Sequence, residues 1–202
     1  MTRPAIYSRP AKPLFIAVKN RKEPAKFQPV ALPSVVAVDR ATECHVTPDD
    51  VARRMVAYLG ECGDYLTLEP SAGTGQLVRA LLASGHSRSE ICMIERHNTL
   101  AAGLAKYGPV INRCFLDYAA EARGKVFFPR VIINPPFSDV RKHIAAALSL
   151  MGPNGHECPP VMVALVPITY QHPDAEELET LPNDTFSTAR VNTKIIRIEA
   201  RP

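Results

Sequence analysis

The sequence predicts an α/β protein built around an open, doubly wound, mostly parallel β-sheet. From about residue 44 onward, short apolar segments alternate with segments whose apolar residues recur at helical spacing. The short segments are apolar throughout, which is typical of parallel strands buried on both faces. With 202 residues, the chain has room for one domain with a substantial core.

Five apolar segments are expected as strands, and four segments between or before them as helices. The expected strands cover residues 65–69, 91–95, 110–115, 130–134 and 160–167. The expected helices cover about residues 47–59, 76–84, 98–107 and 139–150. In the first helix, Thr47 is the expected N-cap, Pro48 takes the first helical position and the following aspartates suit the helix dipole.

Residues 1–43 are expected to form a basic, proline-rich, extended arm ahead of a folded domain at residues 44–202. Residues 1–40 contain eight basic and two acidic residues, whereas the whole chain carries a net charge of +4. Six prolines remove amide donors and restrict the preceding residues, so no long helix is expected there. The arm either contacts nucleic-acid phosphates or is a tail that is solvated or packed on the domain.

Composition argues against several classes of protein. The five cysteines are scattered and form no C-x-x-C pair, which favours buried thiols over a disulfide framework or a metal site. No apolar run approaches the roughly 20 residues that a membrane span needs, and the N-terminus lacks a secretory signal. We therefore expect a cytoplasmic protein without a bound metal and without a membrane segment.

Three of the expected strands end in residues that suit an adenosine-like ligand. The turn "LEPSAGTG" carries Gly73 and Gly75, and a missing Cβ atom permits positive φ and close approach of a ligand. Glu95 ends the second strand, where its carboxylate can accept both ribose hydroxyls. Asp117 follows the third strand and either accepts from an adenine amine or serves as a helix cap or loop acid.

The fourth expected strand ends in "NPPF", residues 134–137. Asn134 can direct its side-chain carbonyl into the cleft, while Pro135 and Pro136 fix the backbone so that a main-chain carbonyl points the same way. Two such acceptors suit an NH2 group, and Phe137 offers a face on which a planar base can stack. The alternative is a strand that two prolines stop, followed by a packed phenylalanine.

The combination resembles the S-adenosyl-L-methionine-dependent amino-group methyltransferases of the DNA adenine-N6 kind. The resemblance is to the subgroup in which the cofactor motif precedes the catalytic motif. It covers about residues 44–170, in the expected order. The matching stretches are "TPDDVARRMV" (47–56), "LEPSAGTG" (68–75), "IE" (94–95), Asp117 and "NPPF" (134–137).

This resemblance implies a seven-stranded, Rossmann-like methyltransferase sheet whose last strands are antiparallel, with residues 184–189 and 192–200 as candidates. It implies S-adenosyl-L-methionine as the cofactor and methyl transfer to an exocyclic amine, first of all N6 of adenine in DNA. Asn134, Pro135, Pro136 and Phe137 would be the catalytic motif. The implied cofactor residues are Thr47 near the methionine carboxylate, Glu69, Ala72, Gly73 and Gly75 along the methionine and ribose, Glu95 at the ribose, and Asp117 at the adenine.

The chain departs from this family because it leaves no room for a separate target-recognition domain. Target recognition would fall to the basic arm, to residues 152–160 or 171–183, or to a protein partner. Similar motifs occur in RNA guanine-N2 and protein glutamine methyltransferases, so RNA and protein stay alternatives to DNA as the substrate. A catalytically idle module that binds nucleic acid or a partner is a further alternative.

Overall fold

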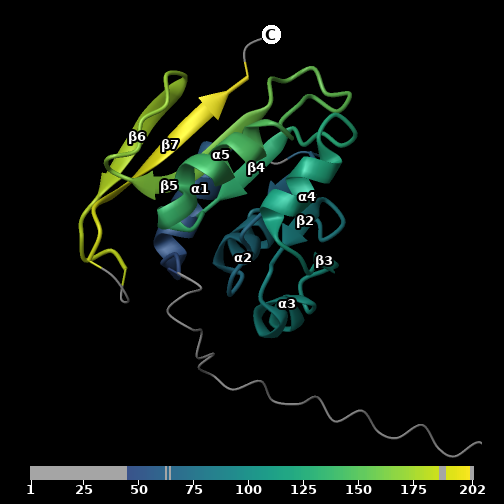
Figure 1. Ribbon diagram of the computed structural model, residues 1–202, viewed down its shortest axis with the longest axis horizontal. Coiled ribbons are helices and arrows are strands. Elements are labelled where there is room, and N and C mark those ends of the chain that lie inside the picture. Colours follow the sequence, from purple (N-terminus) through teal and green to yellow (C-terminus); the bar gives the residue numbers. More distant parts are fainter. Residues whose placement is uncertain (1–44, 62, 64, 187–189, 201–202) are drawn as a thin grey trace, which may run out of the picture. The chain divides into compact units, whose positions relative to one another are not determined.

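The computed structural model describes residues 45–61, 63, 65–186 and 190–200. Within these residues, seven strands form one sheet in the order β3-β2-β1-β4-β5-β7-β6 (Figure 1). The expected arm, residues 1–43, lies outside the described residues, so its extended form stays a prediction. The strands are β1 (Thr67–Glu69), β2 (Ile91–Ile94), β3 (Val110–Ile111), β4 (Arg130–Ile133), β5 (Val161–Pro167), β6 (Ala175–Leu181) and β7 (Thr193–Glu199).

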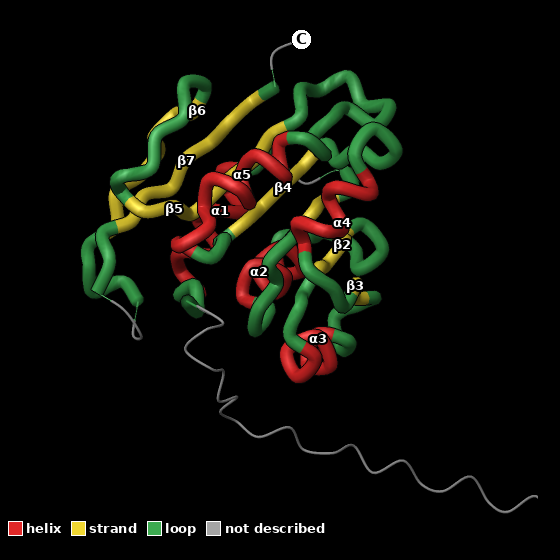
Figure 2. The backbone as a smooth tube through the Cα atoms, in the orientation of Figure 1, coloured by secondary structure: helices red, strands yellow, loops and turns green. Residues whose placement is uncertain are grey.

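Helices connect the parallel strands and cover the sheet (Figure 2). The described helices are α1 (Asp49–Tyr58), α2 (Gln76–Ala83), α3 (Asn98–Leu104), α4 (Phe115–Ala122) and α5 (Val140–Leu148), with a 3-10 turn η3 (Phe137–Asp139) ahead of α5. In α1, Val51, Met55 and Val56 are buried at helical spacing, as the sequence predicts. None of the described helices is long and apolar enough to cross a membrane.

The central strands contribute to two hydrophobic cores, one on each face of the sheet. In β4, Val131 and Ile133 belong to the core that contains residues of α4 and α5, whereas Ile132 belongs to the core that contains residues of α1 and α2. All three side chains are fully buried, and the burial of each contributes roughly 1.5–3 kcal/mol to the stability of the folded state. Burial on both faces explains why these strands read as continuous apolar runs.

The sheet reverses its winding direction at β1. This strand pairs in parallel with β2 on one side and with β4 on the other. The chain therefore proceeds outward through β2 and β3, returns to β4, and continues outward to β5. In sheets of this kind a crevice forms outside the carboxyl ends of the strands at the reversal point, which here are the ends of β1, β2 and β4.

The predicted third strand is wrong in its second half. Strand β3 covers only Val110–Ile111, and Phe115, which was expected in the strand, begins α4. Asn112 interrupts the apolar run and donates from its side-chain amide to the backbone oxygen of Glu95 at 2.8 Å. Helix α4 then buries Phe115, Ala119 and Ala122, a spacing that sequence reasoning overlooked because the run before it is strand-like.

The predicted antiparallel pair is half right. Residues 192–200 contain β7, which pairs antiparallel with both β5 and β6. The other member is β6, Ala175–Leu181. Residues 184–186 are not part of a strand, and residues 187–189 lie outside the described residues. Strand β6 lies at the edge of the sheet and exposes glutamates, so it shows no apolar run. It also occupies much of the polar stretch 171–183 that was a candidate for target recognition.

Candidate functional site

A pocket lies at the carboxyl ends of β1, β2 and β4. Its wall also includes the segment before α1 and the starts of α4 and α5. Eight of the eleven predicted site residues line it, and Phe137, Gly75 and Asp117 do not. The eight are Thr47, Glu69, Ala72, Gly73, Glu95, Asn134, Pro135 and Pro136.

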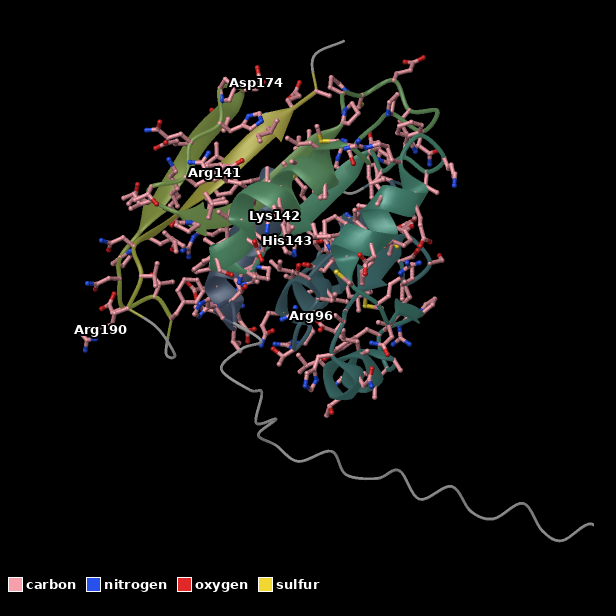
Figure 3. The ribbon with its side chains drawn as sticks, in the orientation of Figure 1. Arg96, Arg141, Lys142, His143, Asp174 and Arg190 are labelled. Carbon is pink, nitrogen blue, oxygen red and sulfur yellow. The ribbon has the colours of Figure 1, made fainter. Side chains whose placement is uncertain are left out.

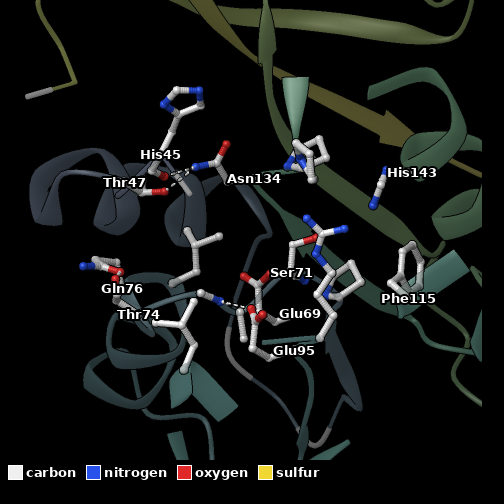
Figure 4. Close-up of a pocket in the computed structure, with 18 of the residues that line it drawn as sticks. His45, Thr47, Glu69, Ser71, Thr74, Gln76, Glu95, Phe115, Asn134 and His143 are labelled. Atoms are coloured by element: carbon white, nitrogen blue, oxygen red, sulfur yellow. Dashed lines mark hydrogen bonds between the residues drawn. The ribbon is translucent and has the colours of Figure 1, made fainter. Parts of the chain in front are cut away.

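Glu95 is buried in this pocket and is held by backbone amides (Figure 4). The Gly73 amide donates to Oε2 at 2.8 Å, and the His97 amide donates to Oε1 at 2.7 Å. A carboxylate offers about four lone-pair sites in total. Each oxygen therefore keeps the capacity to accept a further hydrogen bond, such as one from a ribose hydroxyl.

Glu69 is the most deeply buried acid of the site. Its Oε1 accepts from the Ser71 amide at 3.0 Å, while its Oε2 is buried without a hydrogen-bond partner among the described residues. Burial, reinforced by the nearby charge of Glu95, raises the pKa of Glu69 to about 8 even though the Ser71 amide acts in the opposite direction. Glu69 is therefore largely protonated at neutral pH.

The two glycines of the turn have different roles. Both adopt positive φ, 52° for Gly73 and 85° for Gly75, a conformation that other residues rarely take. Gly73 lines the pocket and donates its amide to Glu95. Gly75 does not line it, and a Cβ atom there would lie 2.8 Å from Cδ2 of Leu104. Gly75 is therefore required by the turn and by the packing of α3, and the structure does not place it against a ligand.

Asn134 follows the last residue of β4 and has a fixed amide orientation. Its Nδ2 donates to the backbone oxygen of His45 and to Oγ1 of Thr47, both at 2.9 Å (Figure 4). Because the backbone oxygen of His45 can only accept a hydrogen bond, the nitrogen of the Asn134 side chain, and not its oxygen, must face it. The side-chain oxygen of Asn134 is buried and has no hydrogen-bond partner among the described residues.

Thr47 is not the helix cap that the sequence predicts. The N-cap position of α1 is Pro48, and no side-chain hydrogen bond caps this helix. The Thr47 hydroxyl instead accepts the hydrogen bond from Asn134. A contact between residues so far apart in the chain leaves no local pattern, so capping was the only role that the neighbouring residues suggested.

Three rings meet beside Asn134. The imidazole of His45 stacks on the ring of Phe137, with centroids 4.9 Å apart and an interplanar angle of 26°. Phe186, from the connection between β6 and β7, lies at 5.8 Å from the ring of His45 and at 6.1 Å from that of Phe137. His45 lines the pocket, whereas Phe137 packs partly buried against the core.

Asp117 lies in the first turn of α4, is exposed and does not line the pocket. The residues just before it, Cys114, Phe115 and Leu116, line the pocket instead. Asp117 was expected just after the third strand because that strand was predicted to end at residue 115, whereas β3 ends at Ile111. An acid in the first turn of a helix is also stabilised by the helix dipole.

Several lining residues were not predicted from the sequence. They include Arg96, which is exposed, and His143, whose pKa is lowered mainly by burial. Nδ1 of His143 lies 3.1 Å from the backbone oxygen of Asp139, so this nitrogen carries the hydrogen. Among the described residues, no group of three or more histidine, cysteine or acidic side chains could hold a metal ion.

Comparison with known proteins identifies the fold. No protein-family model matches the chain, and no curated protein matches its sequence. A methyltransferase subunit of a type I restriction-modification system from Streptococcus thermophilus superposes with a TM-score of 0.61, at 15% identity over 78% of this chain. The chain has the methyltransferase fold. It spans 45% of the length of that subunit.

Two further solved structures are also similar to this chain. The 23S rRNA methyltransferase ErmE matches at a TM-score of 0.60 and 15% identity, over 78% of this chain and 70% of its own. TrmN from Thermus thermophilus matches at 0.54 and 11% identity, over 76% of this chain and 49% of its own. The predicted doubly wound methyltransferase sheet is thus confirmed, whereas the reaction has to be argued from the site.

Proposed function

We propose that this protein transfers a methyl group from S-adenosyl-L-methionine to an exocyclic amine of a nucleobase, with N6 of adenine in DNA as its target. The observation that carries the proposal is the state of Asn134. Its amide nitrogen is held by His45 and Thr47, and its oxygen is a buried acceptor with no partner among the described residues. An acceptor fixed in this way suits the N–H of an incoming amine.

The residues at the other end of the pocket fit the methyl donor. Glu95 can accept ribose hydroxyls on the free lone pairs of its two oxygens. Glu69, which is largely protonated at neutral pH, places an unpartnered oxygen in the wall, which suits a hydrogen-bonding group of the donor's methionine part. Phe115 and Leu116 provide apolar surface for an adenine ring.

When bound, the donor would supply a methyl group already activated by its sulfonium. The chain's own contribution is to hold the target amine in line and to stabilise the positive charge that develops on its nitrogen. Asn134 accepts one N–H hydrogen of that amine. The prolines at 135 and 136 fix the backbone, so that the carbonyl oxygen of residue 135 can accept the second. One amine proton then leaves to water.

Surface charge supports a nucleic-acid substrate. Arg96 is exposed and lines the pocket, and Lys142 pairs with Asp139 at 2.7 Å, next to the lining residue His143. Arg141 is the neighbouring exposed cation, so Arg141, Lys142 and His143 follow one another along α5 (Figure 3). Cations beside a base-binding pocket can contact the phosphates of the same strand and make binding depend on salt.

RNA is the second candidate substrate, because ErmE, named as an rRNA methyltransferase, superposes as well as the restriction-modification subunit does. Sequence specificity on either nucleic acid would come from the N-terminal arm, from a loop or from a protein partner. The pocket itself would be unchanged, since both substrates present an exocyclic amine on a planar base.

The test is transfer of tritiated methyl from the donor to DNA, RNA and protein offered in parallel to the purified chain. Label in DNA, located at N6 of adenine by digestion, is the expected result. Label in RNA alone would replace DNA by the second candidate. Label in protein, or no transfer by a chain that binds the donor in calorimetry, would overturn the proposal.

A further inference from the structure

The acceptor that the proposed reaction needs is covered in this structure. The side-chain oxygen of Asn134 is buried, although no described residue bonds to it. Beside it, the ring face of Phe137 is occupied by the imidazole of His45. A target base could therefore not stack on this face of Phe137 until the imidazole of His45 moves.

His45 is the side chain best placed to move. Its backbone is part of the fixed frame, because its carbonyl oxygen accepts from Asn134. His45 is only partly buried, and its ring contacts those of Phe137 and Phe186. Rotation about the side-chain bonds would uncover Phe137 while the backbone bond to Asn134 stays in place.

We propose that Phe137 and Phe186 form a ring-binding subsite that the imidazole of His45 fills in the free protein and that the target base takes over by displacing it. His45 is then a placeholder and not a catalytic residue. The inference rests on the proposed function for the identity of the incoming ring. It adds which side chain the incoming base displaces.

The geometry of the three rings supports a planar ligand. His45 and Phe137 are nearly parallel, at 26°, and Phe186, which is buried, lies nearly perpendicular to Phe137, at 78°. Aromatic rings favour these two arrangements. A purine has a larger face than an imidazole, so it makes the more extensive stack on Phe137 and can displace His45.

The proposal can be tested by binding alone, without the methyl donor. The probe is a single-stranded oligodeoxynucleotide containing one 2-aminopurine, whose fluorescence is quenched when the base stacks. His45→Ala removes the competing ring and is expected to tighten binding by about 3- to 10-fold, the range that one aromatic contact supplies. His45→Trp keeps a larger ring on Phe137 and is expected to weaken binding by a similar factor.

His156→Ala is the matched control. The ring of His156 also contacts an aromatic ring, that of Tyr65 at 4.6 Å, but His156 does not line the pocket. This variant should bind the probe like wild type. Donor affinity, measured by calorimetry, should be unchanged in all three variants, which shows that the fold and the donor-binding residues Glu69 and Glu95 are intact.

The subsite is supported if affinity for the probe decreases from His45→Ala to wild type and from wild type to His45→Trp. Equal affinities, weaker binding by His45→Ala, or no quenching with any variant would overturn it, since His45 would then be a fixed wall or a second stacking surface. The outcome is separate from that of the methyl-transfer test. If the variants show this affinity order but no methyl transfer is found, the subsite stands and the proposed reaction is wrong. If methyl transfer is found without this order, the proposed reaction stands and the subsite is wrong.

Discussion

The two ends of the pocket are built in different ways. At the donor end, Glu69 and Glu95 follow directly from β1 and β2, and each accepts from a backbone amide two residues further on. At the target end, Asn134 is held from the segment before α1, 87 and 89 residues away. The rings beside it come from three separate parts of the chain.

This difference separates a rigid end from an adaptable one. Backbone amides of the turn after β1 and of the segment after β2 hold the acids of the donor end. The target end depends on tertiary contacts, and in our proposal the side chain of His45 moves when the target base binds. Substitutions at the donor end should therefore change donor affinity or stability, whereas substitutions at the target end should change turnover or target binding.

The largest expected effect concerns the buried acid of the donor end. The pKa of Glu69 is about 8 in the folded protein, against a model-peptide value of 4.5. Between these values the folded state binds one more proton than the unfolded state, so the free energy of unfolding falls as pH rises through this range. Glu69→Gln removes this dependence.

Relative to wild type, Glu69→Gln should therefore gain stability between pH 5 and pH 8.5, by a few kcal/mol with about 5 as the ceiling. Urea unfolding at both pH values measures the difference. Glu121→Gln is the control, because Arg113 lowers the pKa of Glu121 and this exposed acid stays ionised throughout the range. An equal shift in both variants would show that Glu69 is ionised when folded.

At the target end, Asn134→Ala removes the fixed acceptor. Methyl transfer should fall by about 100-fold, as when one preorganised hydrogen-bonding group is lost from a transition state. Donor affinity, measured by calorimetry, should stay within about twofold of wild type, because Glu69 and Glu95 are held independently. Turnover like that of wild type would exclude Asn134 from the mechanism, and a parallel loss of donor binding would contradict the separation of the two ends.

At the donor end, Glu95→Gln should affect binding of the methyl donor and not turnover, whereas Asn134→Ala should affect turnover and not binding. Both carboxylate oxygens accept from backbone amides, so a glutamine would turn its NH2 group toward one of these N–H groups. A buried N–H group left without an acceptor costs about 1–3 kcal/mol. The affinity for the methyl donor should therefore fall by about 10-fold or more. Isothermal calorimetry measures this fall. Turnover at saturating donor should change little, and a variant that binds the donor normally would exclude Glu95 from the donor site.

The same division explains what the sequence could predict. Glu69 ends β1 but was named only through the family resemblance. Gly73, Glu95 and Asn134 all stand at strand ends or in the turn beside them, and parallel strands bring their carboxyl ends to one edge of the sheet. A linear pattern is sufficient for such residues. It also predicted the alternation of strands and helices, because strands buried on both faces have to be apolar throughout.

The remaining features depend on contacts that leave no local signal. His45 and Phe186 reach Phe137 from distant segments, so nothing near them in the sequence marks them as part of the site. Thr47 has the surroundings of a helix cap but bonds to Asn134. Strand β6 was missed because an exposed edge strand carries glutamates where an interior strand would carry apolar side chains.

The smallest expected effect concerns Asp117, which the sequence placed at the donor's adenine. Asp117 is exposed in α4, whereas Phe115 is buried and lines the pocket. Asp117→Asn should therefore leave donor affinity unchanged within error. Phe115→Ala, which removes apolar wall, should weaken donor binding by roughly 1–3 kcal/mol if the adenine ring packs there. Calorimetry on the two variants compares these positions directly. A loss of affinity in Asp117→Asn would mean that the start of α4 rearranges when the donor binds, and that the donor end is less rigid than its backbone hydrogen bonds indicate.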